Sequence, residues 1–154
     1  MQVRYSVVDD RAKLIEIRNE MMEKLVDISH RNGFPAGMEF FSDYVKLWEE
    51  DGTDFIFRGA PHFLVVSAPM NIPTPVEDCL IALTTFELFA QTIGVGTVWD
   101  GLAKYIIKDM LPEFKTRLGI PEDHVVGYAM AFGKPAVHYS RTTQHEPAGV
   151  HFVN

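Results

Sequence analysis

Six histidines are the side chains of this sequence best suited to bind a metal or to move a proton. They are His30, His62, His124, His138, His145 and His151. None forms a His-x-x-x-His pair, and none has a carboxylate at helical metal-ligand spacing. We therefore interpret the histidines as surface or structural residues and predict no metal site.

The segment GVGTVWDG, residues 94–101, contains a Gly-x-Gly of the kind found in dinucleotide-binding loops. Here it leads into a short strand instead of a helix, so it lacks the helix N-terminus that would hold a pyrophosphate. The sequence contains no Gly-x-Ser-x-Gly turn and no P-loop, and no nucleophile–base pair can be identified in it. The residues themselves predict no catalytic side chain, which suits a protein whose chemistry is carried by a bound cofactor.

The composition predicts one globular domain, residues 1–154. Hydrophobic residues make up 47% of the chain, and the net charge of −7 lacks the basic excess that phosphate backbones require. We therefore predict no nucleic-acid partner. Cys79 is the only cysteine and lies in an apolar helical run, so we interpret it as a buried, inert thiol. No stretch of about 20 uncharged apolar residues is present, which predicts no membrane span and a cytoplasmic protein.

Four strands and four or five helices are expected to position these residues. Strands are predicted over 3–8, 63–67 and 125–132 and at GTVWDG. Helices are predicted from a cap at Asp9-Asp10 to about Val26, over 40–49, over 74–94, and after Leu111, beginning with Pro112. This alternation indicates a layered α+β or α/β domain, and the pattern alone leaves the strand directions open.

The predicted helix from Thr74 to Gly94 is the clearest element. Thr74, Pro75 and Glu77 have the spacing of a capping box with proline in the first turn, and Gly94 is a natural end. The helix is apolar on nearly all sides, apart from a narrow stripe of Thr84, Glu87 and Gln91. Such a helix is contacted from several directions, and we expect one of those contacts to be another subunit.

Four segments, in order and at the expected spacing, carry a resemblance to a known family. They are YVKLWEEDGTDFIFRGAPHFLVV, PTPVEDCLIALTTFELFAQTIGVGTVWDG, LGIPEDHVVGYAMAFGKP and YSRTTQHEP. Together they resemble the nitroreductase family of FMN-dependent oxidoreductases, in particular the branch that is sometimes fused to ferredoxin domains. The resemblance covers most of the chain, from Val3 to Val153.

The resemblance implies an α+β fold, a three-layer sandwich with a central, mostly antiparallel sheet flanked by helices. It also implies a homodimer in which the long central helix packs against its partner and two FMN molecules lie in the interface. The C-terminal tail, residues 136–154, would be extended over the partner subunit. No helical period is present in that tail.

The resemblance places Trp99, Asp100 and Gly101 beside the isoalloxazine ring of FMN. The backbone at Asp100-Gly101 would contact the N5–O4 edge, where glycine permits a close approach, and Trp99 would pack near the ring. The alternative is that Asp100-Gly101 is simply a strand-to-helix turn with Asp100 as the N-cap.

Two further positions are carried over as FMN-binding residues. Arg141 stands where the family has a basic residue for the FMN phosphate, and a second basic position falls near His145. Gln2 matches the glutamine of a PSxxNxQP-like turn, with Val3 where proline is usual. The family's RRSxR-like phosphate-binding helix would precede that turn, so we expect an N-terminally truncated chain that lacks roughly the first 50 residues, the length of two ordinary helices with their connections.

The aromatic stripe of Phe40, Phe41 and Tyr44 could lie over the partner's flavin and select planar substrates, or it could be ordinary core. The sequence thus favours an FMN-dependent NAD(P)H oxidoreductase acting on nitroaromatic, quinone or related electron-poor acceptors, with no catalytic side chain and with ferredoxin as a further partner. The alternative is a truncated dimeric protein with weak or no FMN binding that serves a binding or structural role.

Overall fold

The computed structural model of the chain describes residues 2–137, 149 and 151–153. In chain order the elements are β1 (Arg4–Val8), α1 (Arg11–Arg31), α2 (Phe41–Asp51), β2 (His62–Pro69), α3 (Pro75–Thr92), β3 (Gly96–Trp99), α4 (Gly101–Tyr105), the π-helical turn η1 (Ile106–Met110), α5 (Phe114–Arg117) and β4 (His124–Gly133).

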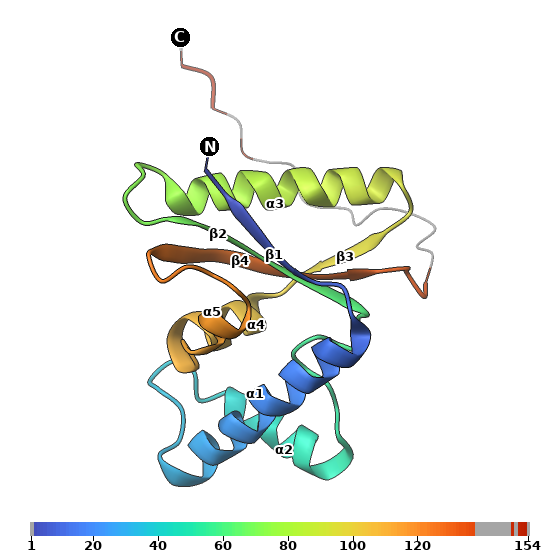
Figure 1. The fold of residues 1–154 in the computed structure, drawn as a ribbon, viewed down its shortest axis with the longest axis vertical. Coiled ribbons are helices and arrows are strands. Elements are labelled where there is room, and N and C mark those ends of the chain that lie inside the picture. The colour runs from blue at the N-terminus through green and yellow to red at the C-terminus, as the bar shows by residue number, and fades with distance from the viewer. Residues whose placement is uncertain (1, 138–148, 150, 154) are drawn as a thin grey trace.

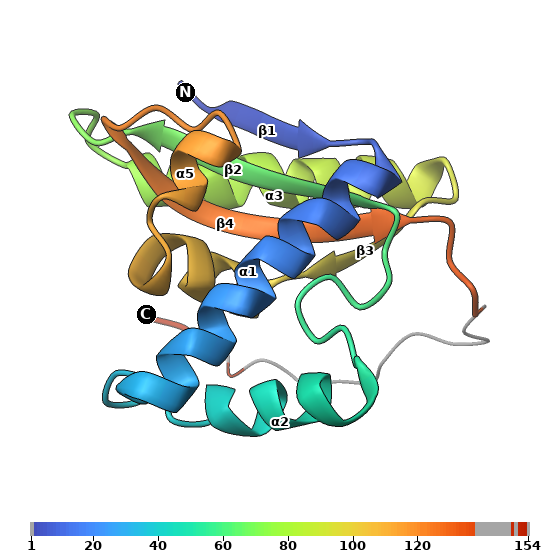
Figure 2. The same ribbon diagram turned by 60° about the horizontal axis from the view of Figure 1, so that its bottom comes forward.

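The four strands form one antiparallel sheet in the order β1-β2-β4-β3. Helix α3 covers one face of the sheet, and α1, α4 and α5 cover the other (Figure 1). Helix α2 lies beyond α1, away from the sheet (Figure 2). This arrangement confirms the predicted α+β sandwich and settles the strand directions as antiparallel.

Strand β2 lies inside the sheet and is buried on both faces, which explains its continuous apolar sequence. Leu64, Val66 and Ala68 belong to the core under α3. Phe63 and Val65 point the other way, into the larger core formed with α1, α2, α4 and α5. The alternation divides one strand between two cores.

Helix α1 begins where the sequence predicted and ends later. The Asp10 side chain accepts a hydrogen bond from the Lys13 N–H at 3.0 Å, as an N-cap does. The helix continues to Arg31, beyond the predicted end near Val26, and Gly33 then turns the chain with φ 68°. The Gly33 N–H donates to the Ile28 carbonyl at 2.9 Å, so Gly33 is the residue that terminates the helix.

Helix α3 has the predicted extent, but the predicted capping box is wrong. Thr74 precedes the helix without a capping hydrogen bond, and its hydroxyl instead donates to Asp78 Oδ1 at 3.4 Å. With φ −133° and ψ 58°, the backbone of Thr74 departs from the extended conformation of an N-cap. At the other end Gly94 has φ 73°, as expected of a helix stop.

Helix α3 lies very close to β4 at Gly127. A Cβ on Gly127 would lie 2.1 Å from Cβ of Cys79, so only glycine permits this approach. Cys79 is fully buried, and burial raises the pKa of its thiol to about 11. A thiol in this environment is inert near neutral pH, as the sequence predicted.

Most of the predicted C-terminal extension, including His138, Arg141 and His145, lies outside the described residues. Among the helices of the described chain, none is long and apolar enough to cross a membrane.

Candidate functional site

A cavity of about 700 Å³ lies beside the edge strand β3. Three segments and Gln91 of α3 line it. The segments are the loop 56–61 before β2, residues 94–98 together with Asp100, and residues 131–137 at the end of β4. These segments lie far apart in the sequence, and the sheet register brings them together. Gly96 pairs with Gly133 and Val98 with Ala131.

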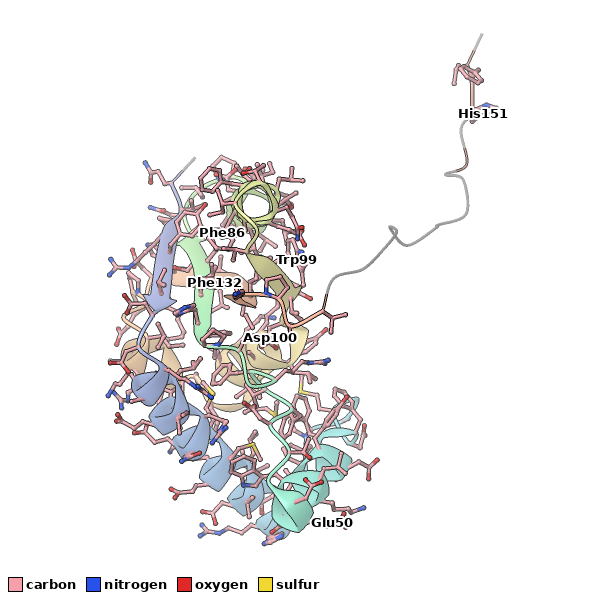
Figure 3. The ribbon with its side chains drawn as sticks, turned by 90° about the vertical axis from the view of Figure 1, so that its right-hand side faces the viewer. Glu50, Phe86, Trp99, Asp100, Phe132 and His151 are labelled. Atoms are coloured by element: carbon pink, nitrogen blue, oxygen red, sulfur yellow. The ribbon has the colours of Figure 1, made fainter. Side chains whose placement is uncertain are left out.

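Strand β3 is attached to α3 through Glu87. The Glu87 carboxylate accepts a hydrogen bond from Trp99 Nε1 at 2.8 Å and one from Thr97 Oγ1 at 3.4 Å. The Trp99 ring also packs edge-on against Tyr128, with ring centroids 5.1 Å apart. Trp99 therefore points to the α3 side of the sheet, while Asp100 lies on the opposite side (Figure 3).

Asp100 caps α4 from a buried position. Its Oδ1 accepts a hydrogen bond from the Ala103 N–H at 2.8 Å, and its own N–H donates to the Ala129 carbonyl at 2.9 Å. The residue is only 6% exposed, and within the described part of the chain Oδ2 has no hydrogen-bond partner. Burial raises the pKa of Asp100 to about 6, although the Ala103 N–H and the positive charge of Arg58 act in the opposite direction.

Gly101 leaves room for the hydroxyl of Tyr128. A Cβ at this position would lie 3.1 Å from the Tyr128 hydroxyl oxygen. Gly101 is also the first residue of α4, so its N–H has no carbonyl four residues earlier within the helix. The structure confirms the N-cap role of Asp100 that the sequence offered as the alternative to a flavin contact, and the flavin contact stays a prediction.

Arg58 lines the cavity in an unusual backbone conformation. Its φ of 54° lies in the left-handed region, which is rare for a residue with a side chain. Asp54 holds the turn, because its carboxylate accepts hydrogen bonds from the Phe57 N–H at 2.9 Å and the Gly59 N–H at 3.1 Å. Phe57 is buried, so the turn is held from both the polar and the apolar side.

The other predicted site residues lie away from this cavity or outside the described chain. Gln2 is exposed before β1. Phe41 is fully buried in the core, Tyr44 stacks on Phe55 with centroids 4.9 Å apart, and Phe40 is exposed. None of these three aromatic residues is among those that line the cavity, so their substrate role stays a prediction. Arg141 cannot be placed among the described residues.

Sequence reasoning missed two residues of this region. The positive φ of Arg58 has no signal in the sequence, because it depends on Asp54 and on buried neighbours. Glu87 was interpreted as part of a polar stripe. A single acid inside a long apolar helix was the available signal, since a partly buried carboxylate needs partners.

Comparison with known proteins identifies the family. The model of the nitroreductase family matches residues 2–134, and the chain belongs to this family. A relative, the "Putative NADH dehydrogenase/NAD(P)H nitroreductase" of Methanothermobacter thermautotrophicus, is 26% identical over 153 residues, which are 95% of this chain and 67% of the relative.

Two solved structures have the same fold. A nitroreductase with bound FMN from Desulfitobacterium hafniense is 27% identical, with a TM-score of 0.67 over 99% of this chain and 76% of that chain. A nitroreductase with bound FMN from Bacteroides fragilis is 18% identical, with a TM-score of 0.73 over the same shares of the two chains.

Proposed function

We propose that this chain is a cytoplasmic, FMN-dependent NAD(P)H oxidoreductase that reduces nitroaromatic, quinone or related electron-poor acceptors. The observation that carries the proposal is the cavity beside β3, which Asp100 lines. Gly101 follows Asp100 as the first residue of α4. Related proteins of this family hold FMN. When bound, FMN supplies the ring that takes a hydride from the nicotinamide and passes it to the acceptor.

The residues of the cavity fit a planar ring with a polar edge. A volume of about 700 Å³ falls within the range of roughly 300–1,000 Å³ that is usual for small-molecule sites. The wall includes apolar side chains such as Ile56, Val98 and Phe132, and it contains one buried carboxylate oxygen that lacks a partner among the described residues. Such an oxygen is rare in the absence of a ligand.

The chain's own residues would bind and orient this ring. Because the Asp100 N–H donates to Ala129, the Gly101 N–H is the donor that we expect at the N5–O4 edge of the flavin. Trp99 does not line the cavity, so we expect it to position β3 through Glu87. Arg141 would contribute to FMN binding as the family resemblance implies. The same role for Gln2, which lies away from this cavity, stays a prediction.

A homodimer is part of the proposal, and the exposed face of α3 supports it. Ile81, Leu88, Phe89 and Ile93 are 59–65% exposed although they are large and apolar. A patch of this kind on a helix indicates a protein contact. If a second copy covers it, the variant Leu88→Glu should be monomeric at micromolar concentration by light scattering. A dimeric Leu88→Glu protein would contradict this assignment of the interface.

Purification and a flavin titration test the proposed activity. The purified protein should be yellow, or should become so after addition of FMN and removal of the excess, and NADH or NADPH should bleach the flavin absorbance. A colourless protein that takes up no FMN would contradict the proposal and favour a binding or structural role. NADH and NADPH added separately, and a reduced ferredoxin as a further donor, would identify the electron source.

A further inference from the structure

One oxygen of Asp100 is not explained by the fold. Oδ1 serves the helix cap, whereas Oδ2 is buried without a hydrogen-bond partner in the described part of the chain, and the residue is 6% exposed. Buried carboxylate oxygens are almost always paired, because desolvation without a partner is costly. Asp100 lines the cavity, so a ligand in the cavity can provide the missing donor.

Arg58 adds a hydrogen-bond donor to the same cavity. It lines the cavity together with Asp100, and its charge acts on the Asp100 carboxyl. Its backbone is held at φ 54° by the hydrogen bonds of Asp54. Backbone strain of this type persists where the surrounding structure enforces it and is concentrated at ligand-binding sites. The cavity thus has a buried acceptor and a cationic donor.

We propose that Asp100 and Arg58 recognise the imide edge of a pyrimidine-dione ring, with Asp100 Oδ2 accepting from the ring N–H and Arg58 donating to an adjacent ring carbonyl. This inference rests on the proposed function, because the flavin ring system carries such an edge: N3–H lies between the C4 and C2 carbonyls. The arrangement is consistent with the Gly101 N–H at the N5–O4 edge, since O4 and N3 are neighbours on the ring. Asp100 is then a specificity-determining residue for the cofactor, in addition to capping α4.

The test compares two flavins that differ only at N3. FMN and 3-methyl-FMN are titrated into the flavin-free wild type, Asp100→Asn and the control Asp123→Asn, and binding is followed by flavin fluorescence. Asparagine retains an oxygen for the Ala103 N–H but places an amide donor where Oδ2 was. Asp123 is exposed at the opposite end of β4 from the cavity, so its replacement should change neither affinity.

The wild type and Asp123→Asn should bind FMN roughly 10- to 100-fold more tightly than 3-methyl-FMN, as expected for a buried hydrogen bond to a charged acceptor. In Asp100→Asn this ratio should fall to near one, mainly through loss of FMN affinity. A wild-type ratio near one, or an unchanged ratio in Asp100→Asn, would overturn the proposal while leaving flavin binding intact. Failure of the wild type to bind FMN at all would overturn both this inference and the proposed function.

Arg58→Gly tests the second half of the pair without damaging the backbone. Glycine adopts a φ of 54° without strain, so this variant should be at least as stable as the wild type. We expect its FMN affinity to fall roughly 3- to 10-fold, the weaker effect of losing one exposed hydrogen-bond donor. Unchanged FMN affinity would remove Arg58 from the site.

If Asp100→Asn changed only the KM for NADH or NADPH and neither flavin affinity, the carboxyl would contact the nicotinamide and the proposal would be wrong.

Discussion

Two aspartates begin helices in this chain in the same way but in different surroundings. Asp10 accepts a hydrogen bond from the Lys13 N–H at 3.0 Å, and Asp100 accepts one from the Ala103 N–H at 2.8 Å. Asp10 is exposed before a helix of 21 residues, whereas Asp100 is buried before a helix of five residues. Capping accounts for Asp10 completely. It does not account for the burial of Asp100, because a cap needs one oxygen and the other has no partner among the described residues.

The largest expected effect is a dependence on pH that Asp100→Asn removes. Burial raises the pKa of Asp100 from 3.8 to about 6 in the folded state, so below pH 3.8 both the folded and the unfolded protein carry the proton. As the pH rises through this interval the unfolded chain ionises first, and stability is lost. In flavin-free protein, Asp100→Asn should therefore gain about 2 kcal/mol in free energy of unfolding relative to the wild type between pH 4 and pH 7.

Urea unfolding at several pH values measures this difference. At each pH the free energy of unfolding of the wild type is subtracted from that of Asp100→Asn. The change of this difference with pH is the result, because any effect of the asparagine that does not depend on pH cancels. A difference that stays flat from pH 4 to pH 7 would show that Asp100 is ionised normally and therefore well solvated or paired.

A third carboxylate, Glu87, is less buried than Asp100 and has partners for both of its oxygens. Replacing it with alanine leaves the Trp99 N–H without its acceptor and should cost about 2 kcal/mol in free energy of unfolding. The near-ultraviolet circular dichroism of Trp99 should change as well. Glu23→Ala, at an exposed position of α1 away from the cavity, should stay within about 0.5 kcal/mol of the wild type. Equal effects of the two variants would mean that Glu87 does not hold β3.

At Asp10, loss of the helix cap should lower stability without changing FMN binding. Asp10→Ala removes an exposed N-cap and should cost about 1 kcal/mol in free energy of unfolding. FMN affinity should be unchanged, because Asp10 does not line the cavity. Thermal unfolding and a flavin titration on the same preparation check both statements, and a weakened FMN affinity would mean that α1 is coupled to the site.

Gly101→Ala should have only a small effect on stability. The new Cβ would lie 3.1 Å from the Tyr128 hydroxyl, which needs only a shift of a few tenths of an ångström, so we expect a cost below about 1 kcal/mol. FMN affinity should nevertheless fall, since the methyl group keeps the ring from the Gly101 N–H. If both stability and FMN affinity were unchanged, the flavin would not approach the backbone at this turn.

Most helices and strands could be predicted from the sequence, because the patterns that indicate them are local. The continuous apolar run around Val65 predicted a buried strand, and Gly94 predicted the end of α3; the structure confirms both. The predicted capping box at Thr74 is wrong because local spacing alone does not determine it. Residue spacing can suggest the hydrogen bond of Thr74, but the backbone of the preceding loop decides whether its hydroxyl reaches the helix amides.

The candidate site was predictable only in part. The pattern offered Asp100 as an N-cap, which the structure confirms. Its place beside a flavin is implied only by the family resemblance and stays a prediction. Its burial depends on β4 and on the loop before β2, which lie far away in the sequence. The same holds for Arg58, whose backbone conformation is set by Asp54 and by buried neighbours.

The most direct test of the account is an FMN titration of the flavin-free wild type, Asp10→Asn and Asp100→Asn side by side. We predict saturable binding of equal affinity for the wild type and Asp10→Asn, and an affinity at least roughly tenfold weaker for Asp100→Asn. Equal affinities in all three proteins, or no saturable binding by the wild type, would contradict the assignment of the cavity at Asp100 as the flavin site.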